Sequence, residues 1–110
     1  MISIYLVCSE IGGQKLHKIG FTRRSPEKRI KEFKTGNASE IYLVDSFQSE
    51  WGTKIEAMLH RIFRDKKIQG EWFNLDSEDV IMFREYCSSI HSNLKFISEQ
   101  NTYFLDKGDF

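Results

Sequence analysis

The sequence predicts an α/β (α+β) domain: a small, mainly antiparallel three-stranded sheet flanked by helices, with an added long C-terminal helix. Three runs of apolar, β-branched and aromatic residues indicate the strands, at residues 2–7, 16–22 and 41–48. A Gly12-Gly13 turn between the first two runs is typical of a β-hairpin. Start signals or apolar residues at every third or fourth position indicate helices that begin near residues 26, 50 and 77.

Length and composition indicate which class of protein this chain belongs to. A chain of 110 residues with 14% aromatic residues and a single Pro is long enough for one domain with a real core. Cys8 and Cys87 stand among apolar residues without metal or disulfide spacing, so we expect buried free thiols. No apolar run approaches the ~20 residues of a membrane span. The N-terminus shows no positively charged leader segment, so we expect a cytoplasmic protein without a signal peptide.

The formal charge is zero but unevenly distributed. Residues 13–36 hold eight Lys or Arg against two Glu, a local charge of +6. Residues 76–110 hold seven acids against three bases, a local charge of −4. This asymmetry favours a face that attracts a polyanion, and a solvated lysine-rich helix face is the alternative.

The predicted hairpin carries polar residues on one side. Tyr5 points away from the aliphatic residues beside it, so we expect it to line a cleft on the less covered face of the sheet. One side of the second strand carries Lys18, Gly20 and Thr22. A glycine inside a strand indicates that something approaches closely there, and a phosphate backbone is one such group.

The first helix has clear boundaries in the sequence. Ser25 and Pro26 suit the N-cap and the first helical position, and Gly36-Asn37 is expected to end the helix. Arg29 lies one position off the expected buried stripe, so its guanidinium can reach a cleft edge while its stem packs.

A second helix is predicted at about residues 50–64, with an apolar face of Trp51, Ile55, Met58, Leu59 and Ile62. Glu56 and His60 are neighbours at the border of that face. A metal ligand would lie at such a border, and so would an ordinary surface glutamate. Residues 71–75, EWFNL, read as a short strand or extended edge.

The last helix is predicted at about residues 77–98, capped by Asp76 with Asp79 in a capping-box position. Its apolar seam consists of Val80, Phe83, Cys87, Ile90, Leu94 and Ile97. The seam can be buried on the sheet or against a second copy, which would give a homodimer through this helix. We favour the sheet because so small a domain needs the covering.

Several segments together resemble the GIY-YIG nuclease superfamily, in a branch common in phages and bacteria whose second motif reads KIG. They are IYLV with Tyr5, KIG with Lys18 and Gly20, EKR with Arg29, KIEAMLH with Glu56, and GEWFNL. The resemblance covers residues 2–75, which suggests a nuclease-like module at 1–75 and an added helix and tail at 76–110 on the same domain. The first motif here, SIY, lacks the usual Gly, and Phe33 stands where some members have a histidine.

The resemblance implies a metal-dependent DNA endonuclease or nickase that leaves a 5′-phosphate and a 3′-hydroxyl. It implies that Tyr5 is the general base and Lys18 its activator or a phosphate contact. Arg29 would bind the phosphate, and Glu56 would bind Mg²⁺ or Mn²⁺. Further expected substrate contacts are Gly20, Thr22, Arg23, Arg24, His60 and Asn74.

Two other functions remain open at this point. One is a nucleic-acid-binding module of the same fold that cuts nothing, with salt-dependent DNA affinity as its signature. The other is a small phage or mobile-element interaction protein that binds a host protein through the seam and the acidic tail. A bacterial or phage-infected host cell is the expected setting for all three.

Overall fold

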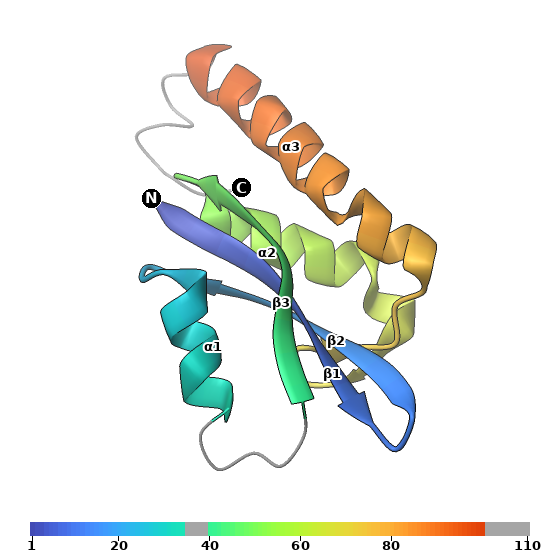
Figure 1. Ribbon diagram of the computed structural model, residues 1–110. Coiled ribbons are helices and arrows are strands. Elements are labelled where there is room, and N and C mark those ends of the chain that lie inside the picture. Colours follow the sequence, from blue (N-terminus) through green and yellow to red (C-terminus); the bar gives the residue numbers. More distant parts are fainter. Residues whose placement is uncertain (35–39, 101–110) are drawn as a thin grey trace.

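A five-stranded antiparallel sheet in the order β3-β1-β2-β5-β4 forms the centre of the computed structural model, which describes residues 1–34 and 40–100 (Figure 1). The elements in chain order are β1 (Ile2–Ile11), β2 (Gln14–Thr22), α1 (Pro26–Lys34), β3 (Glu40–Ser49), α2 (Gly52–Ile62), the 3₁₀ turn η1 (Arg64–Lys66), β4 (Lys67–Gln69), β5 (Trp72–Phe73) and α3 (Ser77–Gln100). The expected α+β class, hairpin and long C-terminal helix are confirmed. The expected helix end at Gly36-Asn37 and most of the acidic tail lie outside the described residues.

The expected number of three strands is wrong, because a second hairpin adds β4 and β5. These two strands pair around a turn at Gly70, which has a φ of 58°. β5 in turn pairs with β2 at His17 and Lys18. β5 lies within residues 71–75, where the sequence predicts a short strand or extended edge. β4 has only three residues, which are too few to show the alternation by which a strand is recognised in a sequence.

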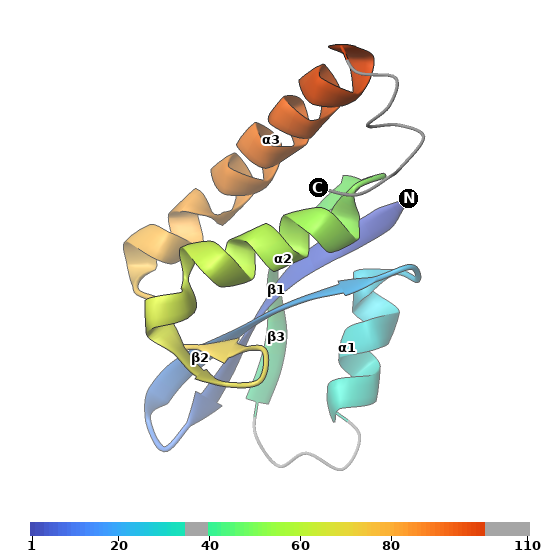
Figure 2. The same ribbon diagram turned by 180° about the vertical axis from the view of Figure 1, so that it is seen from behind.

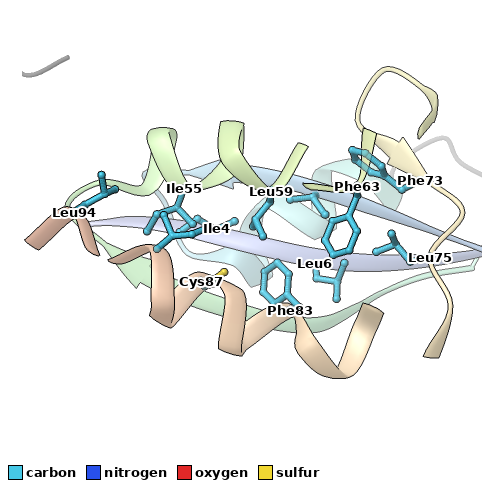
Figure 3. Packing of buried hydrophobic residues seen from close by; sticks show 12 residues of the cluster. Ile4, Leu6, Ile55, Leu59, Phe63, Phe73, Leu75, Phe83, Cys87 and Leu94 are labelled. Atoms are coloured by element: carbon cyan, nitrogen blue, oxygen red, sulfur yellow. The ribbon is translucent and has the colours of Figure 1, made fainter. Parts of the chain in front are cut away.

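Helices cover both faces of the sheet: α1 lies on one side, and α2 and α3 lie on the other (Figure 1 and Figure 2). The larger core lies under α2 and α3, where Ile4 and Leu6 of the sheet meet both helices (Figure 3). A smaller core under α1 contains Tyr5, Val7, Ile30 and Ile41. Since neighbouring residues of β1 point to opposite faces, one strand supplies both cores.

The seam of α3 is buried largely as expected, on the sheet side of the helix. Phe83, Cys87, Ile90 and Leu94 are all buried in the larger core, whereas Ile97 is 41% exposed. Burial also raises the pKa of the Cys87 thiol to about 12, so this thiol is an inert part of the core. These four side chains therefore need no second copy to cover them.

The expected apolar face of α2 is partly wrong. Ile55 and Leu59 are fully buried, but Met58 and Ile62 are 38% and 47% exposed. Phe63, just beyond the helix, is buried instead. The apolar stripe of α2 that is buried is therefore narrower than the apolar face predicted from its sequence. Met58 lines a groove between α2 and α3.

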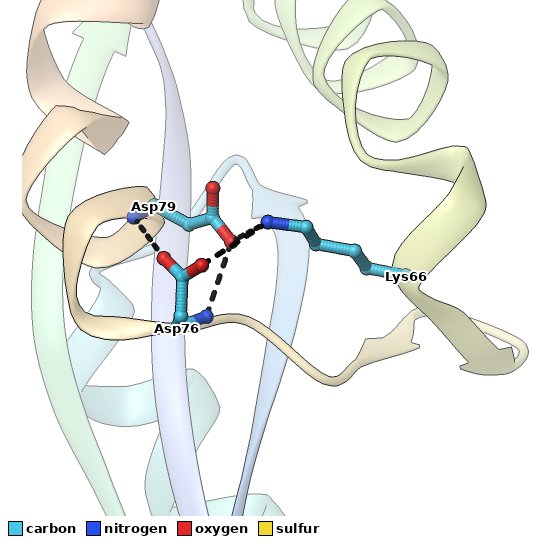
Figure 4. A network of polar contacts seen from close by, with 3 residues as sticks. All are labelled: Lys66, Asp76 and Asp79. Atoms are coloured by element: carbon cyan, nitrogen blue, oxygen red, sulfur yellow. Dashed lines mark hydrogen bonds and ion pairs between the residues drawn. The ribbon is translucent and has the colours of Figure 1, made fainter.

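Polar contacts fasten α3 at its start. Asp76 and Asp79 form the predicted capping box, with the Asp79 N–H donating to Asp76 Oδ1 at 2.9 Å and the Asp76 N–H donating to Asp79 Oδ2 at 3.1 Å. Lys66 ion-pairs with both aspartates, which ties η1 to the first turn of α3 (Figure 4). Arg84 then joins α3 to β3 through Asp45, with Nη2 2.7 Å from Oδ1. Of the helices in the described ranges, none combines the length and apolar character needed to cross a membrane.

Candidate functional site

The outer edge of β2 is where elements from both faces of the sheet meet. β5 accompanies this edge only at His17 and Lys18, within the part of the chain that the structure describes. Just beyond, the Ile19 N–H donates to the Glu71 carbonyl at 3.2 Å, and the Ile19 carbonyl lies 2.9 Å from His60 Nε2 of α2. The edge past Ile19 is therefore bordered by side chains rather than by another strand.

Tyr5 reaches this edge through Gly20, its direct cross-strand partner. Tyr5 is only 1% exposed, so the expectation that it lines an open cleft is wrong for the ring as a whole. A Cβ on Gly20 would overlap the Tyr5 hydroxyl and Cζ and would stand 3.0 Å from Cε1. The close approach predicted at Gly20 is thus made by the Tyr5 ring.

Arg29 joins Tyr5 from α1. Its guanidinium hydrogen-bonds the Tyr5 hydroxyl and also donates from Nη1 to Glu32 Oε2 at 2.7 Å. The Arg29 side chain is 36% exposed, at the margin between core and solvent that its position in the sequence predicted. Glu32 in turn ion-pairs with Arg24, which lies in the loop between β2 and α1.

The environment of Tyr5 favours the protonated phenol. Burial raises the pKa of Tyr5 above its ordinary value of 10.0, and the nearby carboxylate of Glu71 raises it further. The hydrogen bond and the charge of Arg29 lower this pKa, while Glu56 adds a smaller rise. The cation identified as acting on Tyr5 is therefore Arg29 on α1.

Lys18 forms an ion pair that the sequence does not predict. Its Nζ lies 3.2 Å from Glu71 Oε2 and 5.9 Å from the centre of the Trp72 ring. Lys18 thus neutralises part of the charge with which Glu71 acts on Tyr5. Glu71 belongs to the GEWF motif, but the sequence indicates no role for it. Only the β4–β5 hairpin brings Glu71 beside β2.

Glu56 and His60 are adjacent on α2, as predicted, and they are in contact. His60 Nε2 lies 3.2 Å from Glu56 Oε1 and 2.9 Å from the Ile19 carbonyl oxygen. Because both neighbours are acceptors, Nε2 must carry a proton and donate. His60 also packs edge-on against Phe73, with ring centres 4.8 Å apart. In this arrangement His60 orients Glu56, and its Nε2 is already engaged rather than presented to a substrate.

The Glu56 carboxylate lies in a position that disfavours its charge. Burial raises the pKa of Glu56 and the charge of Glu71 adds to the rise, whereas His60 and Lys67 oppose it. A carboxylate oxygen in such surroundings suits a hard divalent cation, which would offset the like charges. Among the described residues no group of three or more His, Cys, Asp or Glu could hold a metal ion. Glu56 alone could supply one carboxylate ligand to a cation such as Mg²⁺, which often takes one or two carboxylates and keeps water for its remaining positions.

Three further expected substrate contacts, Thr22, Arg23 and Asn74, make contacts of their own. Thr22 is buried, and its Oγ1 accepts the Arg24 N–H at 3.1 Å. Arg23 is exposed, with its guanidinium 5.7 Å from the centre of the Phe21 ring. The Asn74 N–H donates to the carbonyl of Lys66 at 2.8 Å, and the Asn74 side chain is exposed.

Comparison with known protein families identifies a domain that this chain matches. The T5orf172 domain matches residues 2–88, which include the whole sheet, α1, α2 and the first half of α3. Neither the curated proteins nor the solved structures contain a match to this chain.

Proposed function

The chain belongs to the T5orf172 domain family of nuclease-type domains, and we propose that it is a metal-dependent DNA endonuclease or nickase of the GIY-YIG type. One observation carries the proposal. Tyr5 of β1 packs across Gly20 of β2 and is hydrogen-bonded to Arg29 of α1. His60 contacts both Glu56 of α2 and the carbonyl of Ile19, the residue before Gly20. Tyr5, Arg29 and Glu56 are thus linked to the same edge of the sheet. These are three of the four residues to which the superfamily resemblance assigns catalysis.

The roles follow from the chemistry of phosphodiester hydrolysis, which needs a base for water and positive charge for the phosphoryl oxygens. Arg29 binds a nonbridging oxygen, for which its planar fork is suited. Tyr5 accepts the proton of the attacking water. Because the pKa of Tyr5 is raised, only a small fraction is ionised at neutral pH, and the hydrogen bond from Arg29 is what favours that fraction.

Glu56 is the residue that would hold Mg²⁺ or Mn²⁺, oriented by the His60 donor. The bound cation would supply positive charge to the phosphoryl oxygens and to the leaving group. Lys18 lies beside Trp72 and is ion-paired with Glu71, so it offsets part of the negative charge of Glu71. The basic side chains of the β2–α1 region then attract the DNA backbone.

The test is cleavage of supercoiled plasmid in the presence of Mg²⁺ or Mn²⁺. Wild type is compared with Glu56→Gln and with Glu50→Gln, a matched control that removes an exposed carboxylate just before α2. We expect nicked or linear product with wild type and the control, and intact plasmid with Glu56→Gln or with EDTA. Intact plasmid in every lane, or cleavage that survives Glu56→Gln, contradicts the assignment.

The second candidate is a nucleic-acid-binding module that cuts nothing, and the raised pKa of Tyr5 is the observation that favours it. A phenol that remains protonated binds phosphate as a hydrogen-bond donor without activating water. Salt-dependent DNA affinity with no metal-dependent product would identify this function. Homodimerisation through α3 stays a prediction, to be tested by sedimentation.

A further inference from the structure

A single carboxylate bridges two arginines beside Tyr5. Glu32 Oε1 lies 2.5 Å from Arg24 Nη2, and Glu32 Oε2 lies 2.7 Å from Arg29 Nη1. Arg24 comes from the loop after β2, whereas Arg29 and Glu32 are one turn apart on α1. Each oxygen of the Glu32 carboxylate thus binds a guanidinium group from a different segment of the chain.

The chemistry of this bridge is that of a phosphate site. A guanidinium binds carboxylate and phosphate oxygens with the same planar fork, so two guanidinium groups that converge on one carboxylate also fit a phosphate. The hydrogen bonds from Arg29 and Arg24 lower the pKa of Glu32, which therefore stays anionic at neutral pH. The side chains of Glu32 and Arg24 are 40% and 59% exposed, so an anion from solution can reach them.

We propose that Glu32 occupies the binding position of a DNA backbone phosphate between Arg24 and Arg29, and that the phosphate displaces it when DNA binds. The inference rests on the proposed function and names the phosphate concerned, because Arg29 also hydrogen-bonds Tyr5. Glu32 thereby keeps the two arginines aligned in the free protein at the expense of affinity. The carboxylate acts as an internal competitor of the substrate.

The experiment measures the affinity of a short fluorescein-labelled DNA duplex in EDTA, which prevents metal-dependent cleavage. Wild type is compared with Glu32→Gln and with Glu27→Gln, which removes an exposed carboxylate from the first turn of the same helix. Both variants lose one negative charge, so the difference between their DNA affinities measures the competition between Glu32 and the DNA phosphate. We expect Glu32→Gln to bind roughly two- to fivefold more tightly than Glu27→Gln, the range that the strength of exposed ion pairs allows.

Two further arms make the result specific. In an Arg24→Ala background, Glu32→Gln should give a smaller gain, because half of the clamp is gone. Inorganic phosphate should shift the side-chain NMR signals of Arg24 and Arg29 at lower concentration in Glu32→Gln than in wild type.

The outcomes separate this inference from the proposed function. Equal affinities of Glu32→Gln and Glu27→Gln, or weaker binding by Glu32→Gln, would overturn the competition and leave DNA binding intact. If no variant binds the duplex while phosphate still shifts the arginine signals more readily in Glu32→Gln, the anion position stands and the DNA function falls.

Discussion

The hydroxyl of Tyr5 occupies the space in which a side chain on Gly20 would begin. The two residues are directly opposite each other on β1 and β2, so the ring of Tyr5 lies across the glycine toward the edge of the sheet. At this position the charges of Glu71 and, to a smaller extent, Glu56 act on the Tyr5 hydroxyl and raise its pKa. Gly20 is therefore part of the candidate site through the space it leaves empty.

Gly20→Ala should displace the Tyr5 ring and lower the free energy of unfolding by about 1–3 kcal/mol, as overpacking of a close-packed region does. Cleavage should fall by roughly 100-fold, because small misplacements of a reacting group have effects of that size. Thermal or urea unfolding measures the first effect and plasmid nicking the second.

A double-mutant cycle provides the control for this prediction. In a Tyr5→Leu background the shorter side chain vacates the space, so Gly20→Ala should lose most of its destabilising effect. An unchanged effect in that background would show that the glycine is needed for another reason.

Much of the fold could be predicted because its signals are local. The Gly12-Gly13 turn, the Ser25 N-cap and the capping box of α3 each depend on residues a few positions apart, and each is present. β5 lies within residues 71–75, where the sequence predicts a short strand, but β4 and the pairing of β5 with β2 could not be predicted, since β2 lies some fifty residues earlier in the chain. The burial of Phe63 in place of Met58 depends likewise on where α3 packs.

The sequence proposes residues for the candidate site, but it does not show the contacts among them. The motif order names Tyr5, Arg29 and Glu56, but only the tertiary structure shows the hydrogen bond between Arg29 and Tyr5. No pattern of neighbouring residues in the sequence indicates the role of Glu71. The ion pair of Arg29 and Glu32 could be predicted from the sequence, because residues three apart on a helix are neighbours.

The rate of cleavage should rise with pH far beyond neutrality. Burial and Glu71 raise the pKa of Tyr5 above 10.0, so the phenolate that accepts the proton becomes about tenfold more abundant with each pH unit below that value. Single-turnover nicking at saturating metal should therefore increase log-linearly up to at least about pH 9.

Tyr5→Phe should lower this rate by roughly 10²–10⁴-fold, the usual contribution of a general base, and should abolish the slope. A rate that levels off near pH 7 in wild type would indicate that another group accepts the proton.

Glu56→Gln should stabilise the fold while it abolishes cleavage. The variant removes a charge that burial and Glu71 disfavour, and it keeps an oxygen for the His60 donor. We expect a gain of about 0.5–2 kcal/mol in the free energy of unfolding at neutral pH, typical of substitutions that relieve an active-site conflict. Urea unfolding of both proteins measures the difference.

The pH dependence of the stability difference between wild type and Glu56→Gln tests the same prediction. Since the folded pKa of Glu56 is raised, the folded state binds this proton more tightly than the unfolded chain does. Wild type should therefore recover stability relative to Glu56→Gln as the pH falls from neutral through the raised pKa to its ordinary value of 4.5. A difference that grows toward acid pH would contradict the raised pKa.

His60→Ala should affect both stability and the orientation of Glu56. Its loss leaves the carbonyl of Ile19 and the carboxylate of Glu56 without their donor, and it removes the edge contact with Phe73. A buried acceptor left unpaired lowers the free energy of unfolding by about 1–3 kcal/mol. We also expect kcat to fall with little change in KM, because His60 acts through Glu56 and not on the substrate.

His60→Gln distinguishes orientation from packing. Its amide N–H can reach the position of Nε2, so it should restore much of kcat although it lacks the aromatic ring that packs on Phe73. Recovery of kcat without recovery of the unfolding midpoint would support orientation of Glu56 by the donor. If kcat instead follows stability across both variants, or if KM rises while kcat is retained, His60 serves packing or substrate binding rather than Glu56.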